Sequence, residues 1–478
     1  MAEIFSPERS ERICPFRGIR YNRGIIGDLA AVICPPYDII TPEQQKLYYE
    51  KSNYNAIRLE LPLEQLGDDD TNNKYNRAAI TFQQWLKQGV LQIDDSPAFY
   101  LHDHYFTYLG KERRRRGLIA WVKLEPWGTT IYPHEETFSK ASDDRLQLMR
   151  ACRANFSPLF SLYQDSEQKI ASILAETSQV KPIIAISVSS PSMRRGQSEG
   201  EKHVVWAITD PSLVRQISRF LAVQPLYIAD GHHRYEAALA YQQERAQCHS
   251  EPFPLVIASR SPDSEQSEEE GAAKQSLTSE EAFNYVMMEL VEFSDIGLVV
   301  LPIHRLVRGI APSALAKLES QLENFFTLDF VPLTEASVSH YGRSEAISKM
   351  MDKAALGILG LEPQSLLVLK QRQDVSTETM MPRNRSQAYK EFSVSLLNHI
   401  ILDKMLELAQ DSGDIVYTVD VNEAYQQIKE GKYQLVFLLN PPQPEMVKAI
   451  ADVEDRMPSK STYFYPKLPA GLIINSLD

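Results

Sequence analysis

Five consecutive polar or small residues, 230–234, form the part of this sequence best suited to chemistry. The preceding residues, 225–229, are mostly apolar and predict a short buried strand, and the following ones are good helix formers. We expect Asp230 to cap this helix, so that the next backbone N–H groups and the helix dipole favour an anion. Histidine and arginine side chains add donors suited to phosphate oxygens. This polar turn, consisting of Asp230, Gly231, His232, His233 and Arg234, predicts a polyphosphate site; an ordinary loop with solvated histidines is the alternative.

A second polar cluster follows a strand-like run that ends at Pro133. It contains His134, Glu135 and Thr137, and a helix is expected to begin shortly after it. Carboxylates in such a loop can bind Mg²⁺ or accept a proton. A capping and solvation role is the alternative. These residues are candidate site residues.

Three other segments place charged or hydroxyl side chains at strand ends or turns. Two prolines precede Tyr37 and Asp38 and fix the direction of both side chains. His304 and Arg305 follow the end of a predicted strand. Lys460 belongs to a basic, hydroxyl-rich turn near the C-terminus, which either meets a phosphate or is a plain loop. We count all of these among the candidate site residues.

The alternating residues of a predicted hairpin, 100–124, carry two further features. His102 and His104 share one face of the strand, where a metal is conceivable but a half-buried sheet surface is expected. The run Arg113–Arg116 is expected to be a solvated edge, since the chain is acidic and no aromatic residues interrupt the run. We assign no residue as a metal ligand.

The elements that must position these residues alternate between helices and strands. A capping threonine, Thr41, with a proline next to it predicts a helix start, and residues 55–61 predict a strand. From residue 261 to residue 281 the chain becomes polar and acidic, which predicts a flexible insertion. The pattern as a whole predicts an α/β fold with mixed sheets.

Composition excludes several classes of function. The net charge of −13 and a pI near 5.4 give no general attraction to nucleic acid or to an anionic membrane. The four cysteines are far apart and form no CxxC pair, which is typical of reduced thiols in a cytoplasm. No run is long enough to span a bilayer, and the first residues do not form a secretory signal. We therefore expect a cytoplasmic protein without nucleic-acid or membrane partners; its oligomeric state is left open.

The motifs described above occur together in a known family. The sequence resembles the DUF1015 family of bacterial and archaeal proteins of unknown function, nearly from end to end and in the same order. The resemblance is carried by Pro35-Pro36-Tyr37-Asp38, His134-Glu135-Glu136-Thr137, Ala229-Asp230-Gly231-His232-His233-Arg234-Tyr235, Leu301-Pro302-Ile303-His304-Arg305, and Met457-Pro458 with Lys460-Ser461-Thr462.

A more distant resemblance carries the chemistry. The helix at 212–221, the strand, the polar turn and its helix resemble the core of the ParB/sulfiredoxin superfamily, which includes free-serine kinases. This resemblance implies a core at 182–310 between an N-terminal α/β region, 1–181, and a C-terminal α/β region, 311–478. It also implies catalytic roles for Asp230 and Glu135, to which we add His233 as a catalytic candidate. It implies phosphate or nucleotide contacts for Gly231, His232, His233 and Arg234, to which we add His304, Arg305 and Lys460 as candidates.

The resulting hypothesis is a nucleotide-dependent phosphotransferase. It would use Mg²⁺ and a nucleoside di- or triphosphate, and it would act on a small hydroxyl-bearing metabolite such as a free hydroxy amino acid. A ParB-type nucleotide switch that hydrolyses slowly or not at all is the second hypothesis. A metal-dependent hydrolase using His134, His304 and the polar turn is the third, and no ligand spacing supports it.

Overall fold

The structure is a computed structural model that describes residues 12–136, 139–188, 200–250, 282–333, 343–352, 355–409 and 413–477. The chain divides into two compact units. Unit 1 comprises Met1–Ile131, Phe138–Gly297 and Lys467–Asp478, and unit 2 comprises Tyr132–Thr137 and Leu298–Pro466. Both contain helices and strands, so the predicted α/β class is confirmed. The division at residues 181 and 310 stays a prediction, and Thr137 and the insertion 261–281 lie outside the described residues.

A nine-stranded mixed sheet organises unit 1. Its order is β6-β11-β8-β12-β5-β4-β10-β9, with β1 paired to β5. Strands β8 and β12 are parallel, and β12, β5, β4 and β10 are antiparallel neighbours. The strands are β1 Ile13–Cys14, β4 Phe99–Tyr108, β5 Lys111–Lys123, β6 Ile131–Pro133, β8 Leu159–Tyr163, β9 Ile184–Val188, β10 Glu201–Ile208, β11 Leu226–Asp230 and β12 Tyr285–Glu292. Two short pairs accompany them, β2 Ile19–Tyr21 with β3 Leu91–Ile93 and β7 Ala154–Asn155 with β21 Asn475–Ser476.

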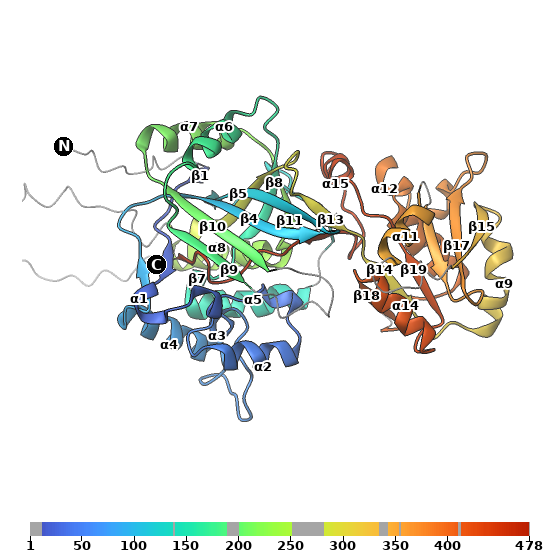
Figure 1. The fold of residues 1–478 in the computed structure, drawn as a ribbon, viewed down its shortest axis with the longest axis horizontal. Coiled ribbons are helices and arrows are strands. Elements are labelled where there is room, and N and C mark those ends of the chain that lie inside the picture. The colour runs from blue at the N-terminus through green and yellow to red at the C-terminus, as the bar shows by residue number, and fades with distance from the viewer. Residues whose placement is uncertain are drawn as a thin grey trace, which may run out of the picture. The chain divides into compact units, whose positions relative to one another are not determined.

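Helices cover both faces of this sheet (Figure 1). One face packs against α6 Lys169–Thr177 and α7 Pro211–Ala222, through buried residues such as Ile217 and Leu221. The other face packs against α4 Lys74–Lys87 and α5 Ser139–Cys152, through residues such as Phe82 and Leu148. The remaining helices of unit 1 are α1 Arg23–Ile26, η1 Leu29–Ala31, η2 Tyr37–Ile39, α2 Pro42–Lys51, α3 Ile57–Glu60, α8 His232–Ser250 and η3 Ala282–Asn284. The sheet therefore separates two apolar cores.

The structure confirms the predicted start of α2 and corrects two other predictions, the strand at 55–61 and the solvated arginine run. Thr41 caps α2 through a complete capping box with Gln44, as predicted. Residues 55–61 are not a strand but contain α3, because the Asn55 side chain accepts a hydrogen bond from Ile57 N at 2.9 Å and starts a helical turn. The run Arg113–Arg116 is not a solvated edge, because β4 pairs with it on one side and the loop after β12 lies against the other, where the Arg116 N–H donates to Asp295 Oδ2 at 3.3 Å.

Unit 2 is built on a six-stranded sheet in the order β15-β17-β16-β19-β14-β18, in which neighbouring strands are antiparallel. The strands are β14 His304–Val307, β15 Phe326–Pro332, β16 Leu356–Leu359, β17 Ser365–Gln371, β18 Ile415–Thr418 and β19 Leu435–Leu438; β13 Val299–Leu301 pairs separately with β20 Tyr463–Tyr465. The helices are α9 Pro312–Leu322, α11 Arg343–Met350, η4 Glu378–Met380, α12 Gln387–Glu391, α13 Ser393–Leu396, the π-helix η5 Leu397–Met405, α14 Val421–Lys429 and α15 Pro444–Ala451. Helices α11 and α14 contribute Ile347 and Ala424 to the core of the sheet.

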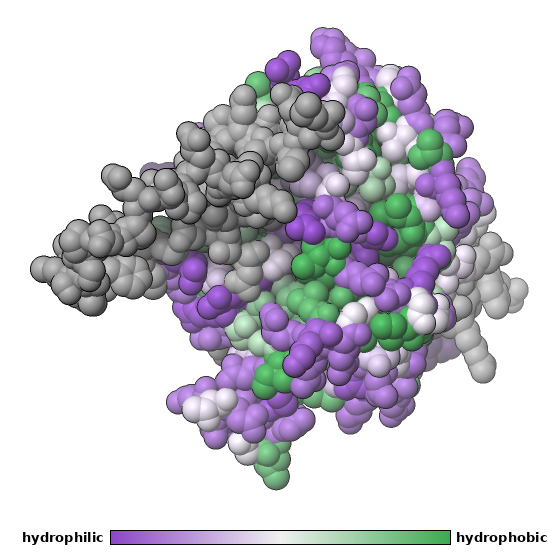
Figure 2. Space-filling view, turned by 90° about the vertical axis from the view of Figure 1, so that its left-hand side faces the viewer, coloured by the Kyte–Doolittle hydropathy of each residue, from purple (hydrophilic) through white to green (hydrophobic). Residues whose placement is uncertain are grey.

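Hydrophilic and hydrophobic residues are interspersed on the face of the molecule shown in Figure 2. Among the described helices, none has the length and the apolar composition needed to cross a lipid bilayer.

Candidate functional site at the start of α8

The polar turn joins β11 to α8 in unit 1. Asp230 is the last residue of β11, Gly231 has a φ of 95°, and α8 begins at His232. The Tyr235 N–H donates to the carbonyl of Gly231 at 3.0 Å, so the helical hydrogen-bond pattern starts from the glycine. A β-carbon at Gly231 would lie 2.9 Å from Nη2 of Arg234. Glycine is therefore needed both for the backbone conformation and for the close approach of the guanidinium.

Asp230 lies between two cations. Its Oδ2 accepts from Arg234 Nη2 at 2.9 Å, and its Oδ1 accepts from Lys467 Nζ. The side chains of Asp230 and Lys467 are 14% and 9% exposed, so the ion pair is largely shielded from water. The shielding strengthens the pair relative to one at the surface.

Arg234 points into the protein. Its Nη1 donates to Ser157 Oγ and to the Pro158 carbonyl, both at 2.8 Å. Burial by itself would lower the pKa of Arg234, but the negative charges of Asp230 and Glu60 raise it above its ordinary value. A guanidinium bound in this way fixes Asp230 and the start of α8 in place.

The segment around Tyr37 reaches the same place. The guanidinium carbon of Arg145 lies 4.0 Å from the centre of the Tyr37 ring. Burial raises the pKa of Tyr37 to about 12, with Asp38 adding to the effect and Arg145 opposing it. The charges of Arg234 and Asp230 also act on this hydroxyl. The structure thus brings Tyr37 and Asp38 to the polar turn.

His233 belongs to a polar group on the first turn of α8. Ser142 Oγ donates to Glu236 Oε2 at 2.6 Å and lies 3.3 Å from His233 Nδ1. The side chains of His233 and Glu236 are each 26% exposed, so both are open to solvent in part. The ring of His232 lies 6.4 Å from that of Trp127.

Several residues of this site have no local signal in the sequence. Lys467, Arg145, Glu60 and Ser157 come from four distant segments, and none stands beside an unusual local pattern. Glu60 accepts from Ser157 Oγ at 3.1 Å and so extends the polar group under Arg234. Only the fold reveals these residues.

The second predicted cluster lies in unit 2. Glu135 accepts from the Lys460 backbone N–H, and from the Thr462 hydroxyl at 3.1 Å. His134 is fully buried, with Nε2 at 2.7 Å from Thr462 Oγ1. Burial alone would raise the pKa of Glu135, but His134 and Lys460 lower it below its ordinary value. The structure thus joins His134 and Glu135 to the turn around Lys460.

His304 and Arg305 are buried at the start of β14 in the same unit. Arg305 donates to the carbonyls of Ile303 and of Lys460, the latter at 2.9 Å. Burial lowers its pKa to about 10. His304 Nδ1 accepts from the Leu439 N–H at 3.2 Å, and burial together with Arg305 lowers its pKa to about 3. Their predicted role in phosphate binding stays a prediction.

Residues 13–395 match the model of the family described as "Protein of unknown function (DUF1015)", and the chain belongs to that family. The family resemblance drawn from the sequence is thereby confirmed. No curated protein matches the sequence.

Several solved structures are distantly similar. A conserved hypothetical protein from Pyrococcus furiosus matches with a TM-score of 0.32 and 12% identity, over 75% of this chain and 95% of that one. A free serine kinase in complex with AMP matches with a TM-score of 0.31 and 11% identity, over 72% and 86% of the two chains. A mutant of a free serine kinase in complex with ADP matches with a TM-score of 0.32 and 10% identity, over 72% of this chain and 87% of that one. AMP and ADP are the ligands of those proteins.

Proposed function

We propose that this protein is a nucleotide-dependent phosphotransferase that binds the phosphates of its nucleotide at the start of α8. The observation that carries the proposal is the ion-paired Asp230, held between Arg234 and Lys467 directly before Gly231 and the helix start. The positive end of a helix dipole and a shielded ammonium both favour a phosphate. The acceptor would be a small metabolite with a hydroxyl group.

The cations would have different roles. Arg234 is a positioning residue, because Ser157, Pro158 and Asp230 occupy its terminal nitrogens. Lys467 and the backbone at the start of α8 would neutralise the charge of the phosphates. Phosphoryl transfer depends chiefly on such positioning and charge neutralisation.

Mg²⁺ would accompany the nucleotide and neutralise phosphate charge. It is usually held by phosphate oxygens and one or two carboxylates. Asp38 fits this donor set, since it is exposed and its charge acts on both Tyr37 and Arg234. Asp38 is therefore the proposed carboxylate ligand.

The group that takes the hydroxyl proton is one of three predicted residues. Both oxygens of Asp230 already accept from cations, which makes it a weak base. His233 is partly exposed beside Ser142, and an imidazole is suited to proton transfer near neutral pH. Glu135 is proposed from the superfamily resemblance alone, because both of its oxygens also accept hydrogen bonds and its lowered pKa makes it a weak base too. The variants His233→Asn and Glu135→Gln test these two assignments separately.

The direct experiment incubates the purified chain with ADP, ATP or CTP, Mg²⁺ and pooled hydroxy amino acids, and detects phosphorylated products by mass spectrometry. We expect one nucleotide to support product formation, and His233→Asn or Glu135→Gln to lower the rate about 10²- to 10⁴-fold without loss of nucleotide binding. Nucleotide binding without any product would instead support the switch hypothesis. Absence of both binding and product would contradict the proposal.

A further inference from the structure

A second group of ionisable side chains lies on the large sheet of unit 1, on strands β4, β5 and β10. His203 on β10 is paired with His104 on β4, and His104 is paired with Arg115 on β5. His102 and His104 are 0% exposed and His203 is 2% exposed. The expected half-buried surface is thus a buried cluster of histidines, which costs free energy unless each polar atom has a role.

Short contacts link His102 to Glu289 on one side and to His203 on the other. His102 Nδ1 lies 2.9 Å from Glu289 Oε2, and His102 Nε2 lies 3.0 Å from His203 Nδ1. With Glu289 ionised and both imidazoles neutral, this geometry places the proton of His102 on Nδ1, and His102 Nε2 accepts from His203 Nδ1–H. The Nε2 of a neutral His203 then presents a lone pair.

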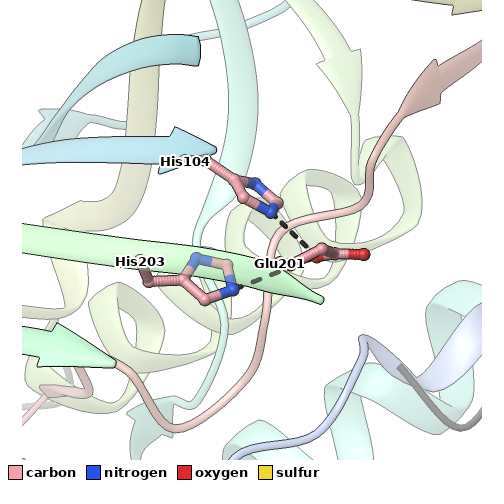
Figure 3. A group of neighbouring side chains, drawn as sticks. All are labelled: His104, Glu201 and His203. Carbon is pink, nitrogen blue, oxygen red and sulfur yellow. Dashed lines mark hydrogen bonds and ion pairs between the residues drawn. The ribbon is translucent and has the colours of Figure 1, made fainter. Parts of the chain in front are cut away.

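That lone pair faces a carboxylate and a second imidazole. Glu201 Oε2 lies 4.0 Å from His203 Nε2 and 2.8 Å from His104 Nε2, and Figure 3 shows the three side chains converging. Their ligand atoms all lie within 4.8 Å of one another. Around a tetrahedral zinc ion with bonds of about 2.0–2.1 Å, ligand atoms are about 3.4 Å apart, a value between the two measured distances.

We propose that His104, His203 and Glu201 bind a divalent transition metal ion of the Zn²⁺ class, with the fourth position left for water. Two imidazoles and one carboxylate are a donor set of catalytic zinc sites. Glu201 is 20% exposed and supplies the solvent side of the site. The proposal does not depend on the nucleotide site.

The surrounding residues support the ligands. A metal-binding histidine usually donates its other N–H to a partner that fixes the ring, and His102 with Glu289 provides this for His203. A β-carbon at Gly117 would lie 2.5 Å from Glu289 Oε1, so the glycine makes room for this carboxylate. The charges of the two glutamates favour a dication.

Arg115 is the group that opposes metal binding. Its Nη2 lies 3.3 Å from His104 Nδ1, and its charge interacts with Glu289 and Glu201. Binding through His104 Nε2 moves the proton of the ring to Nδ1, so the contact with Arg115 must open. The metal would then add to the positive charge that Arg115 presents to Glu201.

Cobalt provides a spectroscopic test on the full-length chain, prepared without a histidine tag and stripped with EDTA. We expect Co²⁺ to bind at about one equivalent with the visible absorption of a four-coordinate site, Zn²⁺ to displace it, and the melting temperature to rise. Glu201→Gln should weaken binding by at least about tenfold. His203→Ala should abolish it, and Glu201→Gln keeps the test valid if His203→Ala fails to fold.

The matched control is His399→Gln, which removes a half-buried histidine of unit 2 and should bind Co²⁺ as the unaltered chain does. The proposal is overturned if the unaltered chain binds neither Co²⁺ nor Zn²⁺. It is equally overturned if a folded Glu201→Gln or His203→Ala variant retains the full affinity.

Discussion

Gly231 is the residue of the polar turn whose replacement has the clearest physical consequence. Gly67 has nearly the same backbone, with a φ of 92° against 95°, but a β-carbon there would meet no atom within 4 Å. Alanine at either position imposes backbone strain, about 1–3 kcal/mol. At Gly231 it also displaces the Arg234 guanidinium.

We therefore predict that Gly231→Ala lowers the free energy of unfolding of unit 1 by more than Gly67→Ala does. All four tryptophans, Trp85, Trp121, Trp127 and Trp206, belong to unit 1, so urea unfolding followed by tryptophan fluorescence reports on it alone. Equal losses in the two variants would mean that the Arg234 contact adds nothing to stability.

His304 provides a prediction of pH dependence. Its pKa is about 3 in the folded state, against 6.5 for an ordinary histidine, because it is buried beside Arg305. Below pH 6.5 the unfolded chain takes up a proton that the folded chain does not, so the stability contributed by the neutral ring falls as the pH falls. From pH 7 to pH 5 this loss is about 2 kcal/mol.

The variant His304→Asn keeps an acceptor near the Leu439 N–H but does not titrate. We predict that this variant loses about 2 kcal/mol less stability between pH 7 and pH 5 than the unaltered chain does, because the contributions of the carboxylates are common to both chains. Hydrogen–deuterium exchange of peptides from β14 and β19 measures the stability of unit 2 at each pH. The same pH dependence in both chains would contradict the assignment.

At the scale of elements, the alternation of side chains along β5 determines which arginines of the run are buried. Arg115 is fully buried, its guanidinium lies 4.8 Å from the Phe160 ring, and its charge balances Glu289 and Glu201. Arg114 next to it is partly exposed. In a strand inside a sheet, neighbouring side chains point to opposite faces.

We predict that Arg115→Met in the metal-free chain costs about 3–5 kcal/mol, because it leaves buried carboxylates without their counter-charge. Arg114→Met is the matched control and should change the stability by about 0.5 kcal/mol or less. Urea unfolding followed by tryptophan fluorescence compares the two. Similar effects would show that burial of Arg115 has no electrostatic consequence.

The elements also show what can be read from the sequence. The polar turn, the α2 capping box and the hairpin of β4 and β5 have local signals, since composition and spacing within a few residues define them. The burial of Arg115 has no local signal, because composition does not reveal that the Phe160 ring and the loop after β12 cover this part of β5. Lys467 and Arg145 reach the site only through long-range packing, which no local pattern encodes.

At the scale of the whole molecule, the last residues of the chain complete unit 1. The larger apolar side chains Leu468, Leu472, Ile473, Ile474 and Leu477 are all buried, and Trp121 Nε1 donates to Asn475 Oδ1 at 2.6 Å. At about 1.5–3 kcal/mol for each apolar side chain, their burial is comparable to the entire stability of a typical domain, about 5–15 kcal/mol.

We predict that a chain ending at Pro466 has an unfolded unit 1, although it retains most of the residues of that unit. Its tryptophan emission should shift to that of solvent-exposed indoles, and the full-length chain is the reference. A truncated chain with native emission and an unchanged melting temperature would show that the C-terminal segment is dispensable.

The proposed function requires that nucleotide phosphates bind at the start of α8 beside Lys467. The most direct test is calorimetric titration of Mg²⁺–ADP and Mg²⁺–ATP into the unaltered chain, Lys467→Met and Lys87→Met, the last removing an exposed lysine of α4. We predict that Lys467→Met weakens binding about tenfold to a hundredfold, as expected for a charge-assisted hydrogen bond, and that Lys87→Met has no effect. Equal affinities in all three chains, or no binding to the unaltered one, would contradict the claim.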